Sequence, residues 1–241
     1  KIRDCLLSVY NLADEIVFIN SSSTDETAEI AQKYTSKIFT RPNNPMLNIN
    51  KNFGFTKATG DWILSLDADE RVTPELASEI ESRVKSQESR VNGYWIPRKN
   101  IIFGKWMKHT GWYPDYQLRL FQKGKSKFPG IHVHEMVTVE GETDYLKGHI
   151  EHLNYETISQ FLSKLTNIYA PNEAEVMIKN GYQFNWKDAI RMPAQEFMNR
   201  FFAQKGYRDG LHGLTLSLLM AFYHLVVFIK VWEERGFTQV N

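Results

Sequence analysis

The sequence predicts an α/β protein in which a central sheet carries helices on its faces. Over the first seventy residues, apolar runs of strand length alternate with segments of helical spacing, the pattern of strands joined by crossover helices. One run, 62–66, ends abruptly in the carboxylates of Asp67, Asp69 and Glu70. Because ligands of open α/β sheets lie at the carboxyl ends of strands, this acidic end is the first candidate for a functional site.

The alternation begins with a helix and a short strand. Apolar residues at helical spacing predict a helix over 2–10, and 15–20 reads as a short buried strand. The polar run 21–25 supplies N-cap residues for a helix over 27–34. A strand, a polar loop and a helix N-terminus offer backbone N–H groups to an anion or a nucleoside. Plain N-capping explains the same cluster without a ligand, and both interpretations stay open.

The next elements lead into the acidic strand and beyond it. Residues 38–39 predict a further strand, and 48–59 reads as a helix that carries Lys51. After the buried strand 62–66, the run 73–75 supplies the Thr cap, first-turn Pro and first-turn Glu of another helix. This repeated order of strand and helix favours a mostly parallel central sheet.

The two aspartates at the end of the 62–66 strand suggest a divalent-metal site. Asp67 and Asp69 alternate along an extended backbone, and burying either without a partner carries a large cost. Hard carboxylate oxygens suit Mg²⁺ or Mn²⁺, which would be shared with the phosphates of a substrate. The same residues are also explained without a metal, by a strand that ends in a solvated acidic loop.

Composition limits the classes of protein to consider. The chain has 241 residues, 24% of them charged, and a net charge of +1, so no global field directs it to nucleic acid. Its single cysteine, Cys5, excludes an internal disulfide and indicates a reducing compartment. The opening segment lacks a signal-like apolar stretch and an initiating Met, and we expect a fragment or a processed chain.

A series of polar and acidic motifs runs through the chain. It comprises Asn-Ser-Ser-Ser-Thr-Asp-Glu-Thr at 20–27, Lys51-Asn52, Ala-Thr-Gly-Asp-Trp at 58–62, Leu-Asp-Ala-Asp-Glu at 66–70, Arg119-Leu120-Phe121, His134-Glu135 and Gly-Tyr-Arg-Asp-Gly at 206–210. The series resembles the family 2 glycosyltransferases of the GT-A fold, and within them the bacterial branch that adds sugars to lipopolysaccharide core. The resemblance implies a GT-A-like, Rossmann-like sheet flanked by helices, with a C-terminal helical extension.

Two features depart from the pattern of that family. Its members begin with a strand that ends in an Asn-Glu pair of the nucleotide pocket, and we expect this first strand to be missing here. Position 20 is usually an acid that recognises the nucleobase, whereas this chain has Asn20. An amide still bonds a uracil edge, but it brings a donor and loses the charge. A UDP-linked sugar is therefore favoured as donor, and the nucleotide stays open.

The resemblance assigns a metal site at the acidic strand end. Asp69 would hold Mg²⁺ or Mn²⁺, which offsets the negative charge that grows on the departing diphosphate. Asp67 would face the ribose or the ion, and His134 is a further candidate ligand of the metal or the phosphate. The histidines at 132–152 fit no closed zinc site, and zinc is not expected.

The resemblance also implies a set of residues that contact the donor. The set is Asn20, Asp25, Lys51, Asp67 and Arg119. Lys51 would donate to the phosphates, although an exposed helix lysine is the commoner outcome. Arg119 lies on a predicted strand and would pair with phosphate or balance Asp115.

The acceptor hydroxyl needs a base on the opposite face of the sugar, because transfer in this family inverts the anomeric centre. Glu135 follows a Gly-containing turn, and its segment resembles the acceptor-side acid motif of the family, so it is the favoured base. Asp115 competes for the role, since it lies among aromatic residues able to stack on a sugar ring.

The segment 154–241 differs in character from the predicted catalytic domain, 1–153. A helix is expected over 157–175, and between 179 and 208 six bases against two acids lie among large apolar side chains, which suits an anionic membrane surface. The apolar run 214–229 has sixteen residues, fewer than the roughly 20 of a spanning helix. It suits an interfacial or re-entrant helix, a homo-oligomer interface, or a helix packed on the core.

Together these observations predict a metal-dependent, inverting glycosyltransferase. It would move a sugar from a nucleotide-sugar donor to a lipopolysaccharide-core or other glycolipid acceptor, at the cytoplasmic face of the bacterial inner membrane. A non-catalytic, membrane-associated scaffold with a GT-A-like fold and a nucleotidyltransferase, which releases pyrophosphate, stay open as alternatives. A haloacid-type phosphatase is disfavoured, because Arg71 stands where that motif needs a hydroxyl residue.

Overall fold

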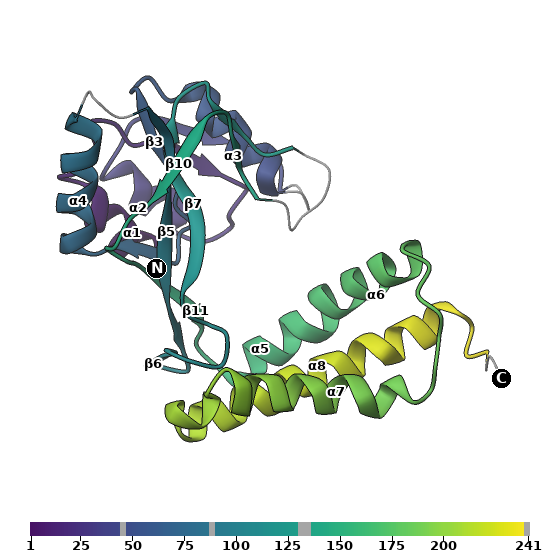
Figure 1. Ribbon diagram of the computed structural model, residues 1–241. Coiled ribbons are helices and arrows are strands. Elements are labelled where there is room, and N and C mark those ends of the chain that lie inside the picture. The colour runs from purple at the N-terminus through teal and green to yellow at the C-terminus, as the bar shows by residue number, and fades with distance from the viewer. Residues whose placement is uncertain (44–46, 87–89, 130–135, 239–241) are drawn as a thin grey trace. The chain divides into compact units, whose positions relative to one another are not determined.

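The structure is a computed structural model, which describes residues 1–43, 47–86, 90–129 and 136–238 (Figure 1). The chain forms two compact units. The first comprises Lys1–Lys99 and Asp115–His152, and the second comprises Asn100–Pro114 and Leu153–Asn241. Each unit has a hydrophobic core of its own and is described separately below.

The N-terminal part of the first unit alternates helices and strands, as the sequence predicts. The elements are α1 (Ile2–Val9), β1 (Phe18–Asn20), α2 (Thr27–Gln32), β2 (Ile38–Thr40) and α3 (Leu47–Lys57). β1 and β2 pair in parallel as a two-stranded sheet. The side chains of Ile2, Leu6 and Ala31 pack α1 against α2 in a small buried cluster. The predicted elements are therefore confirmed, although β1 and α2 are shorter than expected.

The central sheet of the first unit is built around two long strands. Its strands are β3 (Trp62–Leu64), β4 (Glu70–Val72), β5 (Val91–Ile102), β7 (Asp115–Gln122), β10 (Glu142–Tyr145) and β11 (Ile150–Tyr155). The order is β3-β7-β5-β11-β4, with β10 paired to β5. A separate antiparallel pair is formed by β8 (Ser126–Lys127) and β9 (Thr138–Val139). The α/β class, with a central sheet and flanking helices, is confirmed.

The direction of the strands differs from the prediction of a mostly parallel sheet. β3–β7, β5–β7 and β11–β4 are antiparallel, and parallel pairing is found for β1–β2 and β10–β5. Parallel neighbours need a long crossover, usually a helix. In the described residues of the first unit, no helix follows α4 (Pro74–Lys85), so the strand–helix rhythm of the first seventy residues does not extend to the later strands.

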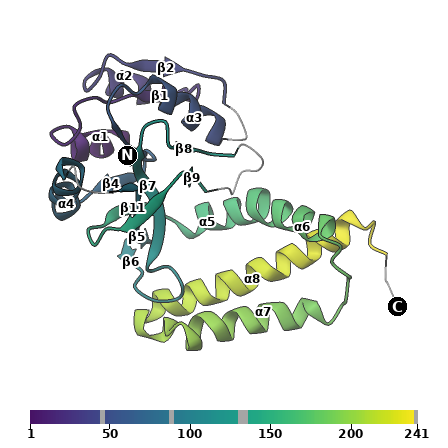
Figure 2. The same ribbon diagram turned by 45° about the horizontal axis from the view of Figure 1, so that its top comes forward.

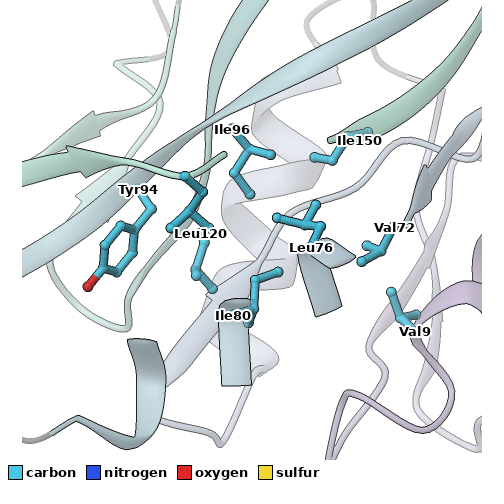
Figure 3. Packing of buried hydrophobic residues seen from close by; sticks show 9 residues of the cluster. Val9, Val72, Leu76, Ile80, Tyr94, Ile96, Leu120 and Ile150 are labelled. Carbon is cyan, nitrogen blue, oxygen red and sulfur yellow. The ribbon is translucent and has the colours of Figure 1, made fainter. Parts of the chain in front are cut away.

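The core of the first unit lies between the sheet and α4. Figure 3 shows side chains of α4 and of the strands pointing toward one another. The cluster is Val9, Val72, Leu76, Ile80, Tyr94, Ile96, Leu120, Leu146 and Ile150. The side-chain oxygen of Thr73 accepts a hydrogen bond from the N–H of Leu76, and Pro74 lies in the first turn, so the predicted cap is confirmed.

β3 packs on both of its faces, as its apolar sequence predicts. Trp62 and Leu64 lie against the core beneath α4. Ile63 points the other way, into a second cluster with Phe121 and with Phe55 of α3. Side chains of a strand alternate between faces, so three successive apolar residues require an apolar layer on each side. The acidic residues after β3 therefore begin where this double burial ends.

The second unit is mainly helical. β6 (Lys105–Trp106) pairs with the end of β5. The helices are α5 (Ile158–Lys164), the π-helical turn η1 (Leu165–Tyr169), α6 (Ala170–Lys179), α7 (Asp188–Met198), a second π-helical turn η2 (Asn199–Ala203), the 3₁₀ turn η3 (Gly206–Asp209) and α8 (Leu211–Glu234). Figures 1 and 2 both show α7 and α8 side by side. Their core contains Ile102, Met107, Tyr155, Phe161, Leu165 and Leu216.

Two expectations for these helices need correction. The helix expected over 157–175 continues to Lys179, and a π-helical turn precedes Pro171, because proline cannot donate a backbone hydrogen bond. The apolar run 214–229 lies within the longer α8, which has 24 residues and is long and apolar enough to cross a membrane. A helix of only sixteen residues is therefore wrong, because α8 extends beyond the apolar run at both ends, from Leu211 to Glu234. Core helices of other proteins meet the same criteria.

Candidate active site

The acidic residues form a tight turn between β3 and β4. The N–H of Asp67 donates to a side-chain oxygen of Glu70 at 2.9 Å, and the N–H of Glu70 donates back to the carbonyl of Asp67 at 2.9 Å. Asp69 lies inside this closed turn. Ser65 extends the pairing of β3, since its N–H donates to the carbonyl of Arg119 at 2.8 Å. The turn is therefore held to β7 on one side and starts β4 on the other.

Glu70 anchors the turn from within the protein, where its side chain is fully buried. Arg119 of β7 donates to its Oε1 at 2.6 Å, and Arg98 of β5 lies 3.4 Å from the same oxygen. A buried carboxylate without such partners would be strongly destabilising. Two arginines from neighbouring strands therefore make this buried acid tolerable.

Arg119 joins Glu70 to Asp67. Its Nη2 lies 2.7 Å from Oδ2 of Asp67, and its side chain is itself buried. Burial alone would lower the pKa of Arg119, but the charges of Glu70 and Asp67 outweigh it and raise the pKa above its ordinary value. The structure places Arg119 against these two carboxylates, and its predicted contact with phosphate stays a prediction.

Lys51 reaches the other oxygen of Asp67. Its Nζ, on α3, lies 2.6 Å from Oδ1 of Asp67, whose side chain is 38% exposed. Burial alone would raise the pKa of Asp67, but Arg119 and Lys51 outweigh it and hold that pKa well below its usual range. Both oxygens of Asp67 thus touch a cation, and Asp67 is an anion at neutral pH.

Asp69 differs from the other two acids of the turn, because no lysine or arginine among the described residues forms an ion pair with its side chain. Its side chain is 29% exposed, and Nε2 of His152, on β11, lies 3.8 Å from its Oδ1. Burial and the charge of Arg98 lower the pKa of His152 and outweigh the acids nearby, so the imidazole is neutral at pH 7. Neutral histidine beside a carboxylate leaves the negative charge of Asp69 available to a cation.

Asp115, the first residue of β7, completes a continuous line of charges. Nη2 and Nε of Arg98 lie 2.7 and 2.9 Å from its Oδ2, and Gln117 donates to its Oδ1 at 2.8 Å. The line is Asp115, Arg98, Glu70, Arg119, Asp67 and Lys51, and we refer to it as the charge network. It connects α3, the acidic turn, β5 and β7, so the candidate base Asp115 and the candidate donor residue Lys51 belong to one ionic structure.

The loop after β1 holds the other two predicted donor residues. Asn20 is buried at the end of β1, and its Oδ1 accepts from the N–H of Ser23 at 3.0 Å. Asp25 accepts from the N–H of Thr27 at 3.1 Å, and hydrogen bonds from Thr27 lower its pKa. Both contacts are local side-chain to backbone bonds that hold the loop in shape. The N-cap predicted from residues 21–25 is wrong, because α2 begins after Glu26, whose side chain makes no capping bond.

Helix α3 connects that loop with the charge network. The amide of Asn50 donates to the hydroxyl of Ser21 at 2.9 Å, and the next residue, Lys51, bonds to Asp67. The third residue in this row, Asn52, donates to and accepts from the backbone of Phe128 at 2.9 Å. Three consecutive side chains of α3 therefore contact the loop after β1, the acidic turn and Phe128.

Two predicted site residues have no described position, and three residues of the site were not predicted. Glu135 and His134 lie outside the described residues. Glu70, Arg98 and His152 were not predicted as site residues. Glu70 carried a signal, because it directly follows the two aspartates, whereas the other two come from distant strands that no motif marks.

Asp69 and Asp67 are the described carboxylates that could bind Mg²⁺ or Mn²⁺ at the turn. In the part of the chain that the structure describes, no three side chains of the metal-binding types cluster as a complete cage. Magnesium sites commonly use one or two carboxylates and take the remaining oxygens from substrate phosphates and water. Asp69 fits that requirement, while both oxygens of Asp67 are engaged by cations.

An α/β unit with an acidic turn at the end of a buried strand has acids where ligands of such folds usually bind. A family model described as "Glycosyl transferase family 2" matches residues 1–139, more than half of the chain. The chain belongs to glycosyl transferase family 2. The predicted family is thereby confirmed.

The chain is also similar to individual proteins along nearly all of its length. It is 27% identical to an uncharacterized glycosyltransferase of Rickettsia typhi, covering 97% of this chain and 82% of that protein. It is 24% identical to the lipopolysaccharide core biosynthesis glycosyltransferase LpsC of Rhizobium meliloti, covering 96% and 87%. A solved structure of S. aureus TarS residues 1–349 with UDP-GlcNAc aligns with a TM-score of 0.46 at 13% identity, covering 100% and 89%.

Proposed function

We propose that this family 2 enzyme transfers a sugar, with inversion, from a nucleotide-sugar donor to a lipopolysaccharide-core or other glycolipid acceptor. Membership of the family supports sugar transfer, and the printed name of the Rhizobium relative supports the class of acceptor. The observation that carries the proposal is the acidic turn after β3, where Lys51 bonds to Asp67 and Asp69 lies two residues further on, beside His152.

The network suggests separate roles for the two aspartates. Asp67 is held between Lys51 and Arg119, so we assign it the positioning of the Lys51 ammonium beside the turn. Lys51 then donates to the diphosphate of the donor, which carries the charge that an ammonium binds best. Asn20 and Asp25 shape the loop that receives the nucleoside. Arg119 acts on the donor only through Asp67, because its own side chain is buried.

Asp69 is the residue that would hold Mg²⁺ or Mn²⁺, with His152 neutral beside it. When bound, the ion supplies positive charge against the diphosphate as the glycosidic bond breaks. Asp67 is the weaker candidate ligand, since binding a metal would require it to release a cation. His134 stays a candidate ligand, and it lies outside the described residues.

We retain Glu135 as the base that accepts the proton of the acceptor hydroxyl. The support comes from the environment of the competing candidate, Asp115. Both of its carboxylate oxygens are in hydrogen bonds, to Arg98 and to Gln117, so it belongs to the charge network. A base must be within reach of the proton it removes, and an oxygen shared with a guanidinium is poorly placed for that role. Removal of Glu135 should therefore leave donor binding and abolish transfer.

The test is a screen of UDP-, GDP- and ADP-linked sugars, with nucleoside diphosphate and pyrophosphate measured separately in Mn²⁺ and in EDTA. Transfer predicts release of nucleoside diphosphate that requires a glycolipid acceptor. Asp69→Asn should abolish it, while the matched control Asp61→Asn, an exposed acid just before β3, should keep full turnover. Release of pyrophosphate from a nucleoside triphosphate would favour a nucleotidyltransferase. Absence of donor binding in calorimetry would favour the scaffold.

A further inference from the structure

We infer that the outer face of α7 and η2 is a docking surface for an anionic membrane. We call this face, with the turn that follows it, the α7 face; it comprises Trp186, Lys187, Ile190, Arg191, Met198 and Phe202, followed by Lys205, Tyr207, Arg208 and Leu211. The inference concerns the second unit alone, and it stands independently of which sugar the first unit transfers.

The apolar part of the α7 face is a row of large side chains that nothing in the described chain covers. Trp186, Ile190, Met198 and Phe202 are each more than half exposed. Ile190, Met198 and Phe202 follow one another at spacings of eight and four residues, which keeps successive members on one side of the helix, and Trp186 lies in the turn just before α7. The wider π-helical turn of η2 lets Phe202 stay near the side of Met198, four residues earlier. The opposite side of α7 packs against α8.

The same segment separates its charges in a way that the sequence alone does not reveal. Residues 182–211 contain three acids, Asp188, Glu196 and Asp209, and the side chain of each is at most 16% exposed. Asp188 pairs with Arg191 and Glu196 pairs with Arg200, while Asp209 accepts a hydrogen bond from the backbone N–H of His109 at 2.8 Å. The acids of the segment are therefore turned inward, and each has a partner there.

The bases of the segment remain outside. Lys187, Lys205 and Arg208 are exposed, and Arg191 is 61% exposed even though it reaches Asp188. The surface left to solvent is thus apolar along its middle and positive at its edges. Such a surface matches a bilayer whose anionic headgroups meet the bases and whose upper acyl region receives the apolar row.

The turn between α7 and α8 continues the pattern. Tyr207 is half exposed and Leu211 is 76% exposed, with Lys205 and Arg208 next to them. Aromatic rings with a polar edge prefer the headgroup level of a membrane, and lysine or arginine extends its charge from there to phosphate.

A second copy of the chain is a poorer occupant than a membrane. In a two-fold dimer the same patch meets itself, so the exposed bases would face their own copies. Like charges brought together in an interface oppose association. Nucleic acid is also a poorer match, because Ile190, Met198 and Leu211 add nothing to phosphate contacts or base stacking.

The test is co-sedimentation of the full chain with vesicles of phosphatidylethanolamine and phosphatidylglycerol, and in parallel with vesicles of phosphatidylcholine. We expect binding to the anionic vesicles that weakens steeply with salt, and little binding to the neutral ones. The double variant Lys187→Glu, Ile190→Ser should lower the affinity by about tenfold or more, since a single base near the surface is worth roughly fivefold. Circular dichroism checks that the helices persist.

The matched control is the double variant Lys33→Glu, Leu7→Ser, which changes an exposed base and an exposed apolar residue in the first unit. It should bind vesicles as the parent chain does. Equal binding to both lipids, or an unchanged affinity in the Lys187→Glu, Ile190→Ser variant, would overturn the inference. So would concentration-dependent dimers in light scattering that this variant dissolves, because the face would then belong to a second copy.

Discussion

Replacement of Arg119 by methionine is the most direct perturbation of the charge network. The guanidinium lies 2.6 Å from Glu70 and 2.7 Å from Asp67, so a single substitution removes one cation from two carboxylates. Methionine keeps much of the length and volume of the side chain, which limits the cavity left in the sheet. The change therefore reports mainly on charge.

The size of the effect follows from the burial of each partner. Removing one partner of a buried ion pair costs about 3–5 kcal/mol, because the other charge stays buried without compensation. Glu70 is fully buried; it would keep the hydrogen bond from the N–H of Asp67, and among the described cations it would keep the longer, 3.4 Å contact with Arg98. Asp67 is partly exposed and keeps Lys51, so it adds little. We therefore expect Arg119→Met to lower the free energy of unfolding by about 3 kcal/mol, the lower end of that range.

Urea unfolding at pH 7 measures this loss as a change in the free energy of unfolding. The double variant Arg119→Met, Glu70→Gln should recover a large part of it, because the orphaned charge is gone. A loss below about 1 kcal/mol, or no recovery in the double variant, would refute the reasoning about burial.

Three further predictions concern the acids and the thiol near the turn. The lowered pKa of Asp67 contributes stability above about pH 4, and this stability is lost as the pH falls further. The urea midpoint of the parent chain should therefore decline between pH 6 and pH 2. The decline should be smaller in Lys51→Met, which lacks one of the cations that lower this pKa. Burial and the nearby acids raise the pKa of Cys5 to about 12, so a disulfide reagent at pH 8 should label it only after unfolding, whereas fast labelling of the native chain would contradict this. Asp69→Asn should abolish turnover with an unchanged urea midpoint, because its nearest partner is 3.8 Å away; a large loss of stability would make Asp69 structural.

Apart from β4, the elements of the first seventy-five residues were predictable because local interactions produce them. The cap of α4 depends on Thr73 and on the backbone three residues later, and β3 is recognised by its own apolar run. Such signals act over one turn or one strand, so a single sequence contains them in full. The same signals predicted the position of the acidic turn correctly.

The strand direction and β4 were not predictable in the same way. Glu70 reads as one more solvated acid, yet it begins β4 and is fully buried. The burial of Glu70 is possible because Arg98 and Arg119, from later strands, form ion pairs with its carboxylate. Propensity disfavours a buried glutamate at that position, and only the tertiary partners reverse the preference.

For the C-terminal helices, too, the sequence predicts the excess of bases, and the fold decides where the charges lie. The sequence shows more bases than acids between 179 and 208, but it does not show which of them face outward. Packing of α7 against α8 turns Asp188 and Glu196 inward, where each meets an arginine of its own helical segment. The positive outer surface is therefore a product of the fold.

The sequence by itself determined the family, the α/β class and the placing of acids at the end of a buried strand. The tertiary structure decided which charges meet: Arg119 joins Glu70 from 49 residues away and Asp67 from 52 residues away. Hydrogen-bonded turns and apolar periodicity are encoded over a few neighbouring residues. An ion pair depends on a distance of a few ångströms between remote segments, and only the packed sheet sets that distance.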